Sequence, residues 1–300
     1  MSSRPALLIS FLLVLQSAVS SADAVISGAV AVGYEHDSNV AVEELDRSSG
    51  LGDSGLVSSF ELDLDTDISE TVNLVSSYSY SRIDYDTFDL LNRETHTFGL
   101  NLNIDFGSVN SATSYFYIQA RLDGKDFLNY QRLSPALSGF ISKRWFLRGA
   151  YVYAEKDVSS RPGRNATNNG AELDAYFFWQ GLRRYINAGY QFRAENSEAA
   201  RFDYHARQAK LRFVQRITLL ERLSTLELGI RYEDRDYKEA TPSIAKRRRD
   251  NRFRFKIEFE FPLTKSISWT AYSGYSDYQS NLPTADYEQT LIGTRIEWTF

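Results

Sequence analysis

The chain has 300 residues, with 34 Lys and Arg against 39 Asp and Glu, and a formal net charge of −5 at pH 7. This acidic balance argues against nucleic acid as a partner, because nucleic-acid-binding domains carry basic patches. The absence of Cys excludes a disulfide scaffold. The sequence also has no apolar run long enough for a transmembrane helix.

The first residues read as a removable targeting segment. Arg4 precedes an apolar run over 6–15, and Ala22-Asp23-Ala24 is a small-x-small cleavage signal. Together these features predict a secretory signal peptide over residues 1–24, cleaved near Ala24. The remaining residues, 25–300, form the single predicted domain.

Fourteen segments follow in which apolar and polar residues alternate, the period expected of strands with one apolar face. In chain order they are 26–35, 55–65, 71–84, 94–106, 111–122, 131–142, 144–155, 170–180, 185–195, 205–217, 224–236, 252–261, 267–278 and 287–300. Short turns such as 66–70 and 107–110 join some of them, and longer polar loops such as 36–54, 156–169 and 237–249 join others.

Two of these segments carry a weaker pattern. In 111–122 we expect Phe116, Ile118, Ala120 and Leu122 to face lipid, and we expect the opposite face to point inward with Tyr115, Tyr117, Gln119 and Arg121. In 131–142, Pro135 lacks the amide proton that a ladder hydrogen bond needs, so a bulge is expected there.

A soluble sandwich can also alternate, but it has no reason to sort its connections by length. An even strand number, alternating long and short connections and both ends at the short-turn side are typical of bacterial outer-membrane barrels. Each segment has about the 9 to 11 residues that a tilted strand needs to cross a bilayer. The sequence therefore predicts an all-β protein, a transmembrane antiparallel up-and-down β-barrel of about 14 strands, in the outer membrane.

The inward-facing positions carry most of the strand charges. Acids are expected near the periplasmic ends and bases near the middle or the outer ends, and both sets are predicted to line a pore. Rings of one charge select ions of the opposite sign, so the outer half would concentrate anions, with 246–249 adding to the attraction. Alternatively, the charges pair across the wall and only solvate it. The acids are Asp63, Asp65, Asp105, Glu258, Glu260 and Glu297, and the bases are Arg121, Arg132, Arg193, Arg231, Arg252, Arg254 and Lys256.

Catalytic and metal sites find little support in the sequence. The three histidines, His36, His96 and His205, have no nucleophile or acid motif tied to them. The acids between Asp37 and Asp53 could bind a hard cation, but their spacing fits no fixed pattern, so a solvated loop is preferred. No enzyme activity, metal or cofactor is predicted.

The two ends of the chain carry a resemblance. The stretch 32–40, Val-Gly-Tyr-Glu-His-Asp-Ser-Asn-Val, resembles the opening of the barrel domains of surface lipoprotein assembly modifiers and related porins. The tail 275–281 and the final Ile-Glu-Trp-Thr-Phe resemble the end of the same barrels, without the helical repeats that precede them in that family. The resemblance implies that Trp298 and Phe300 belong to an insertion signal read by the barrel-assembly machinery.

Three functions agree with these observations. The first is a passive, weakly selective pore for small polar or anionic solutes. The second, implied by the resemblance, is a translocation channel for a surface lipoprotein or other exoprotein. The third is a structural or adhesive barrel that acts through its loops. The expected partners are outer-membrane lipid and lipopolysaccharide, the assembly machinery, and small solutes or an exported protein.

Overall fold

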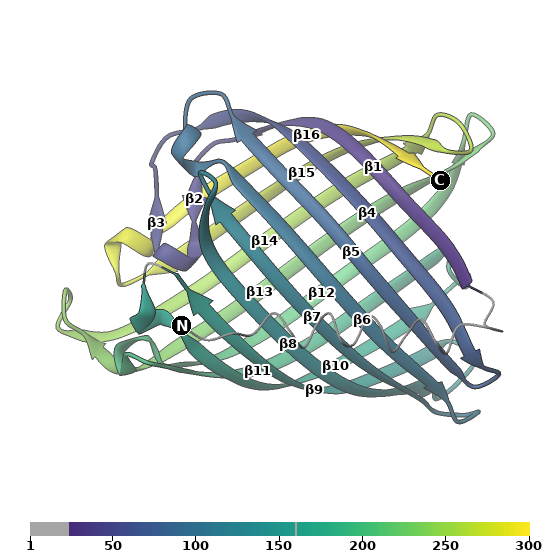
Figure 1. Cartoon of the computed structure of the whole chain (residues 1–300), viewed down its shortest axis with the longest axis horizontal. Coiled ribbons are helices and arrows are strands. Elements are labelled where there is room, and N and C mark those ends of the chain that lie inside the picture. Colours follow the sequence, from purple (N-terminus) through teal and green to yellow (C-terminus); the bar gives the residue numbers. More distant parts are fainter. Residues whose placement is uncertain (1–23, 160) are drawn as a thin grey trace.

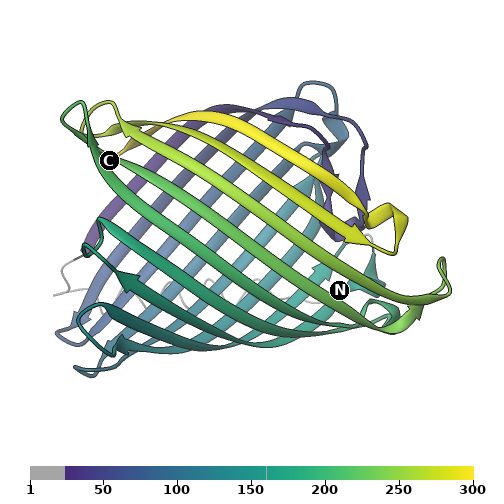
Figure 2. The ribbon, with the colours of Figure 1, turned by 180° about the vertical axis from the view of Figure 1, so that it is seen from behind.

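The computed structural model describes residues 24–159 and 161–300. Fourteen antiparallel strands, each paired with the next and the last with the first, form a closed barrel (Figures 1 and 2). This confirms the predicted fold. The predicted signal peptide lies outside the described residues, apart from Ala24.

The barrel strands are 13 to 20 residues long, and most are longer than the predicted segments. They are β1 (Ala24–Asp37), β4 (Asp53–Ser69), β5 (Val72–Tyr85), β6 (Arg93–Asp105), β7 (Asn110–Leu122), β8 (Lys125–Phe140), β9 (Trp145–Val158), β10 (Ala166–Phe178), β11 (Arg184–Ser197), β12 (Tyr204–Leu219), β13 (Arg222–Thr241), β14 (Lys246–Pro262), β15 (Ile267–Ser280) and β16 (Tyr287–Thr299).

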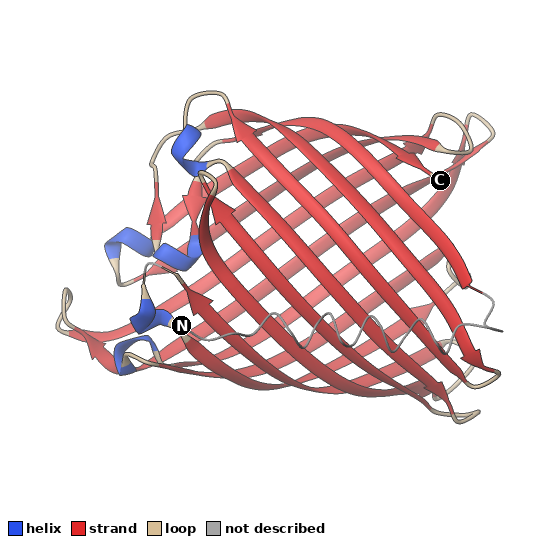
Figure 3. Cartoon of the chain, in the orientation of Figure 1, coloured by secondary structure: helices blue, strands red, loops and turns tan. Residues whose placement is uncertain are grey.

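The two ends of the barrel carry different kinds of connection between strands. One end, here called the loop end, carries a small sheet of β2 (Ala41–Val42) and β3 (Arg47–Ser48) and five short 3-10 helices, all at the same side of the barrel in Figure 3. The opposite end, the turn end, carries short turns. The 3-10 helices are η1 (Glu43–Leu45), η2 (Asp89–Leu91), η3 (Pro162–Arg164), η4 (Ala200–Phe202) and η5 (Pro283–Ala285).

The outer face of the wall is apolar. Large apolar side chains with high exposure occupy alternate positions along the strands, for example Leu173, Ile230 and Ile296. Charged residues are common at the positions between them, which point to the other face of the wall. Exposed apolar surface is favourable against lipid, which is the arrangement of transmembrane barrels. In the described ranges, no helix is long and apolar enough to span a bilayer.

The barrel closes where β1 meets β16. The amide of Gly28 donates to the Phe300 carbonyl at 3.0 Å, and the Phe300 amide donates to the Gly28 carbonyl at 3.0 Å. A Cβ at position 28 would lie 2.6 Å from Cζ of Phe300 and 2.8 Å from the Glu61 carbonyl oxygen. Only glycine leaves room for the Phe300 ring at this seam.

The boundaries differ most from the prediction in two places. A tight turn at Asp123 and Gly124, both with positive φ, lets β8 begin at Lys125 rather than at 131. The predicted loop 237–249 is mostly the hairpin of β13 and β14, which turns between Thr241 and Lys246. Charged residues on both faces made this hairpin resemble a loop.

The bulge expected at Pro135 is also wrong. Leu133 pairs with Tyr153 and Ala136 with Ala150, so the register of β8 against β9 is unchanged across the proline. Only the pairing of residues 134 and 135 with β9 is interrupted. The irregularity of β8 lies instead opposite Ala120 and Arg121 of β7.

The faces of β7 are the reverse of the prediction. The Ser114 hydroxyl donates to Oδ1 of Asn101 at 2.9 Å, and Asn101 belongs to the lumen-facing set of β6. By alternation, Phe116, Ile118, Ala120 and Leu122 therefore face the lumen. Tyr115, Tyr117, Gln119 and Arg121 face outward.

Candidate functional site

The longest loop folds back into the barrel mouth. Residues 38–52, here called the docked loop, contain β2, η1 and β3, and Figure 1 shows these elements at the loop end. Nδ2 of Asn39 donates to the Glu288 carbonyl at 2.9 Å, and its Oδ1 accepts from the Gly50 amide at 3.0 Å. The base of the loop is thereby fixed to β16.

One side of the docked loop rests on an apolar patch. Val42 and Leu45 pack against Ala120, Phe127 and Val158, which lie on β7, β8 and β9. This contact explains the reversed faces of β7, since its lumen face is apolar in order to hold the loop. In sequence, a strand face that binds an apolar loop looks the same as one that faces lipid.

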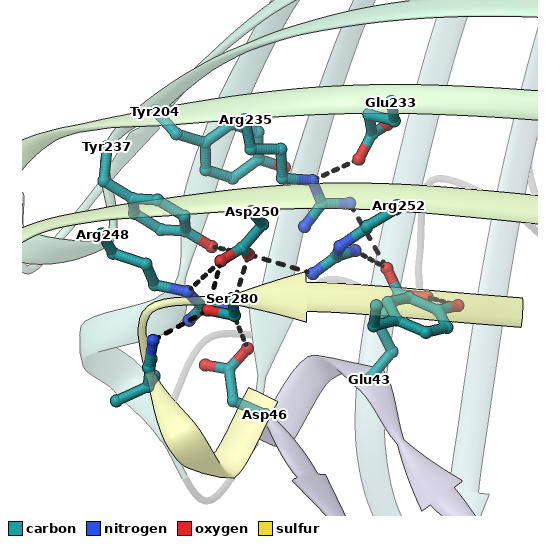
Figure 4. A network of polar contacts seen from close by, with 12 residues as sticks. Glu43, Asp46, Tyr204, Glu233, Arg235, Tyr237, Arg248, Asp250, Arg252 and Ser280 are labelled. Atoms are coloured by element: carbon teal, nitrogen blue, oxygen red, sulfur yellow. Dashed lines mark hydrogen bonds and ion pairs between the residues drawn. The ribbon is translucent and has the colours of Figure 1, made fainter. Parts of the chain in front are cut away.

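The other side of the docked loop is held by arginines. The Glu43 carboxylate accepts from Nη2 of Arg254 at 2.5 Å and from Nη2 of Arg235 at 3.3 Å, and it also pairs with Arg252 (Figure 4). Tyr278 donates its hydroxyl proton to the same carboxylate at 3.4 Å. Burial alone would raise the pKa of Glu43, but the three guanidinium groups lower that pKa far below its usual value.

A second acid of the loop is bound a few residues further on. Oδ1 of Asp46 accepts from Nη2 of Arg248 at 2.8 Å, and Arg164 binds the other oxygen. Burial would raise the pKa of Asp46, but these two arginines lower it to about 2. Arg248 is 2% exposed, and Asp250 binds it at 2.7 and 2.8 Å (Figure 4).

A third contact completes the docking. Nζ of Lys156 binds Glu44 at 3.2 Å and Glu195 at 2.8 Å. The solvated loop expected from the sequence is therefore wrong for these acids. The missed signal is a complementarity of charge: an acidic segment at 43–46 matches inward arginines at alternate positions of β14.

The predicted pore-lining bases divide into three groups. Arg121 does not line the lumen as predicted, because the faces of β7 are reversed. Its side chain faces outward and pairs with Asp126 at 3.1 Å. Arg252 and Arg254 face inward but are occupied by Glu43. The remaining predicted bases lie on inward faces: Arg132, Arg193, Arg231 and Lys256.

The predicted acids lie at inward positions towards the turn end. Asp65 accepts from Nδ2 of Asn73 at 2.5 Å, and Glu258 binds Lys256 at 2.9 Å and Arg295 at 3.5 Å. The others are Asp63, Asp105, Glu260 and Glu297. Trp298 and Phe300 project from the outer face at the seam, with their rings 5.0 Å apart.

The docked loop and the wall neutralise most of the basic layer expected in the outer half, but not Arg231, which has no ion pair within the described residues. Arg248, within the basic run 246–249, is among the neutralised groups. Ion pairs elsewhere in the lumen join strands that are two apart in the wall: Glu172 of β10 binds Arg132 of β8 at 2.9 Å, and Asp174 of β10 binds Lys210 of β12 at 2.8 Å. The alternative of charges paired across the wall fits this region.

The two hollows described next lie beside and below the docked loop. The first has a volume of about 430 Å³ and lies between Glu43, Glu44 and the lumen face of β7. The second, of about 450 Å³, lies against β8 to β13. Tyr130, Asn168 and Arg193 line both hollows, so the two hollows are adjacent.

Comparison with solved structures supports the class of fold. The anion-selective porin from Comamonas acidovorans is similar over 93% of this chain and 100% of its own, with 10% identity and a TM-score of 0.56. OmpT, an outer membrane protein of Vibrio cholerae, matches over 94% and 99%, with 7% identity and a TM-score of 0.55. CdiB from Acinetobacter baumannii matches over 93% of this chain and 66% of its own, with 10% identity and a TM-score of 0.52.

The chain thus has the fold of bacterial outer-membrane β-barrels. Neither protein-family models nor curated protein sequences match it. The resemblance of its two ends to lipoprotein assembly modifiers stays a prediction.

Proposed function

We propose that the protein is a passive, weakly selective outer-membrane pore for small polar or anionic solutes, with a mouth narrowed by the docked loop. The observation that carries this proposal is the pair of adjacent hollows in the lumen, lined in large part by charged and polar groups. A barrel that served only as a scaffold would gain stability by filling such space with apolar side chains. A polar lumen is what water-filled barrels have.

The proposed selectivity is weak because most lumen charges are paired. Arg231, whose side chain is exposed, has no ion pair within the described ranges. It lines the second hollow together with Arg132 and Arg193. A small excess of positive charge at this level favours anions without excluding cations. The anion-selective porin among the similar folds is compatible with this reading.

Planar-bilayer recordings test the proposal. The purified protein is expected to give stepwise conductance in KCl, and a salt gradient is expected to give a reversal potential on the side of anion preference. Arg231→Glu should reduce that preference, whereas Arg121→Glu, on the outer face, should leave it unchanged. Cation preference in the unmodified protein would contradict the anionic part.

Two further measurements separate the alternatives. Proteoliposomes should swell in small neutral sugars, and cell fractionation should recover the protein in the outer membrane. A protein without conductance or swelling would instead fit a structural or adhesive barrel. Loss of a surface-exposed protein after deletion of the gene would favour a translocation channel.

A further inference from the structure

The second hollow has an unusual charge balance. Five cationic side chains and two carboxylates line it, so positive charges outnumber negative ones by three. Glu172 is shared by Arg132 at 2.9 Å and Arg148 at 3.5 Å, and Asp174 is shared by Arg148 at 3.4 Å and Lys210 at 2.8 Å. Each of these two carboxylates therefore forms ion pairs with two cations. The positive charge of this wall is only partly neutralised.

The register adds a second observation. Arg231 of β13 pairs directly with Arg254 of β14, and both face the lumen. Like charges at directly opposite positions destabilise a sheet unless an anion lies between or beside them. Glu43 supplies that anion for Arg254, at 2.5 Å. No carboxylate of the described residues does so for Arg231, which borders the hollow instead.

The hollow also has the size and the neutral groups of a ligand site. Its volume of about 450 Å³ falls in the range of small-molecule pockets, roughly 300 to 1,000 Å³. Tyr130, Tyr176 and Gln208 line it and can donate or accept hydrogen bonds. A chloride ion would leave most of this space to water, whereas a larger anion would contact several cations together.

From the loop end, access to the hollow runs past the docked loop. Arg193 lines the first hollow, the second hollow, and a third, of about 140 Å³, that touches Glu43. Nη2 of Arg193 is 3.4 Å from Glu233, a carboxylate that also binds Arg235. Arg231 lines the third hollow as well. An anion that entered beside the loop would therefore meet both Arg193 and Arg231 on its way into the second hollow.

We propose that the second hollow is a binding site for polyvalent anions that carry phosphate or carboxylate groups. Guanidinium groups bind both kinds of oxyanion through paired N–H donors, which explains why arginine predominates over lysine here. This inference rests on the proposed pore. It adds that such anions pause in the lumen rather than passing as freely as chloride.

Blockade of single-channel current tests this site. Pyrophosphate, and separately citrate, is added to channels that conduct KCl, and the current is expected to fall with a saturable dependence on concentration. Arg231→Gln should raise the half-blocking concentration about tenfold, as expected for the loss of one charge-assisted hydrogen bond. Arg121→Gln is the matched control and should change it less than twofold. The two probes distinguish phosphate from carboxylate as the preferred group.

The outcomes separate the site from the pore. KCl conductance without saturable block by either anion would overturn the site and leave the pore standing. If the protein gave no conductance, calorimetric titration of the detergent-solubilised protein with pyrophosphate would test the site directly. Binding that weakens in Arg231→Gln and not in Arg121→Gln would support it, and absence of binding would overturn it. Heat-modifiable migration in gels confirms that each variant is folded.

Discussion

Glu43 shows how a single side chain can position a whole loop. It binds three arginines from β13 and β14, whose positions are about 200 residues away in the chain. The acidic segment and the alternating basic strand can both be recognised in the sequence. The path of the loop cannot be predicted from the sequence, because that path depends on contacts between distant segments rather than on local periodicity. The pairing was therefore not predictable.

Glu43→Gln is expected to weaken docking of the loop. Removing one partner of a buried ion-pair network costs about 3 to 5 kcal/mol, and the lower value applies because the Glu43 side chain is 33% exposed. We expect a larger or more frequently open conductance in planar bilayers. Asp89→Asn, an exposed acid on η2, is the control and should have no effect. An unchanged conductance in Glu43→Gln would show that the docked loop does not limit the current.

The depressed pKa values predict how docking depends on pH. The pKa of Glu43 is lowered and that of Asp46 is about 2 in the docked loop, whereas free side chains titrate near 4.3 and 3.9. Acids with depressed pKa values stabilise docking above their ordinary pKa, and this contribution is lost as the pH falls towards the lowered values. Docking should therefore be constant from pH 7 to about 5 and should weaken between about pH 4 and 2.

A spin label can follow this release. The chain has no Cys, so Arg47→Cys, at an exposed position of the docked loop, gives a single attachment site. The nitroxide spectrum should stay unchanged down to about pH 5 and then show increased mobility. Increased mobility between pH 7 and 5 would mean that other groups control docking.

At the scale of strands, the alternation of apolar and polar residues identified all fourteen. It was reliable wherever the two faces differ strongly, as in β14 with its Phe and Ile on one side and charges on the other. It failed on β7 because both faces there carry apolar or aromatic side chains, one for the docked loop and one for lipid. Strand ends were underestimated where charged residues continue the hairpin beyond the apolar band.

Single cysteines on β7 test its orientation. Phe116→Cys should react with a membrane-impermeant thiol reagent that enters the lumen, because Phe116 pairs with the lumen-facing Arg132. Tyr115→Cys, one position earlier, should react at least several times more slowly because it faces lipid. Labelling of reconstituted protein, read by mass shift, gives both rates. The opposite order of rates would restore the orientation predicted from the sequence.

At the scale of the molecule, closure depends on whether the first and last strands can meet. Gly28 and Phe300 exchange two hydrogen bonds at this seam, and the Phe300 ring lies over the space where a side chain at 28 would be. The periodicity of β1 and β16 predicts that both belong to the wall. It cannot predict this close approach, which depends on the register between the two strands.

Gly28→Val is expected to destabilise the closed barrel. Its side chain would overlap the Phe300 ring and the Glu61 carbonyl, and overpacking of this kind costs about 1 to 3 kcal/mol. Gly149→Val is the matched control, because a Cβ at 149, on β9, would meet no atom within 4 Å. The measurement is the temperature at which the folded form is lost in heat-modifiability gels, which should fall for Gly28→Val and stay the same or rise for Gly149→Val. Equal temperatures for the two variants would show that the seam tolerates a side chain and that the Phe300 ring is free to move away.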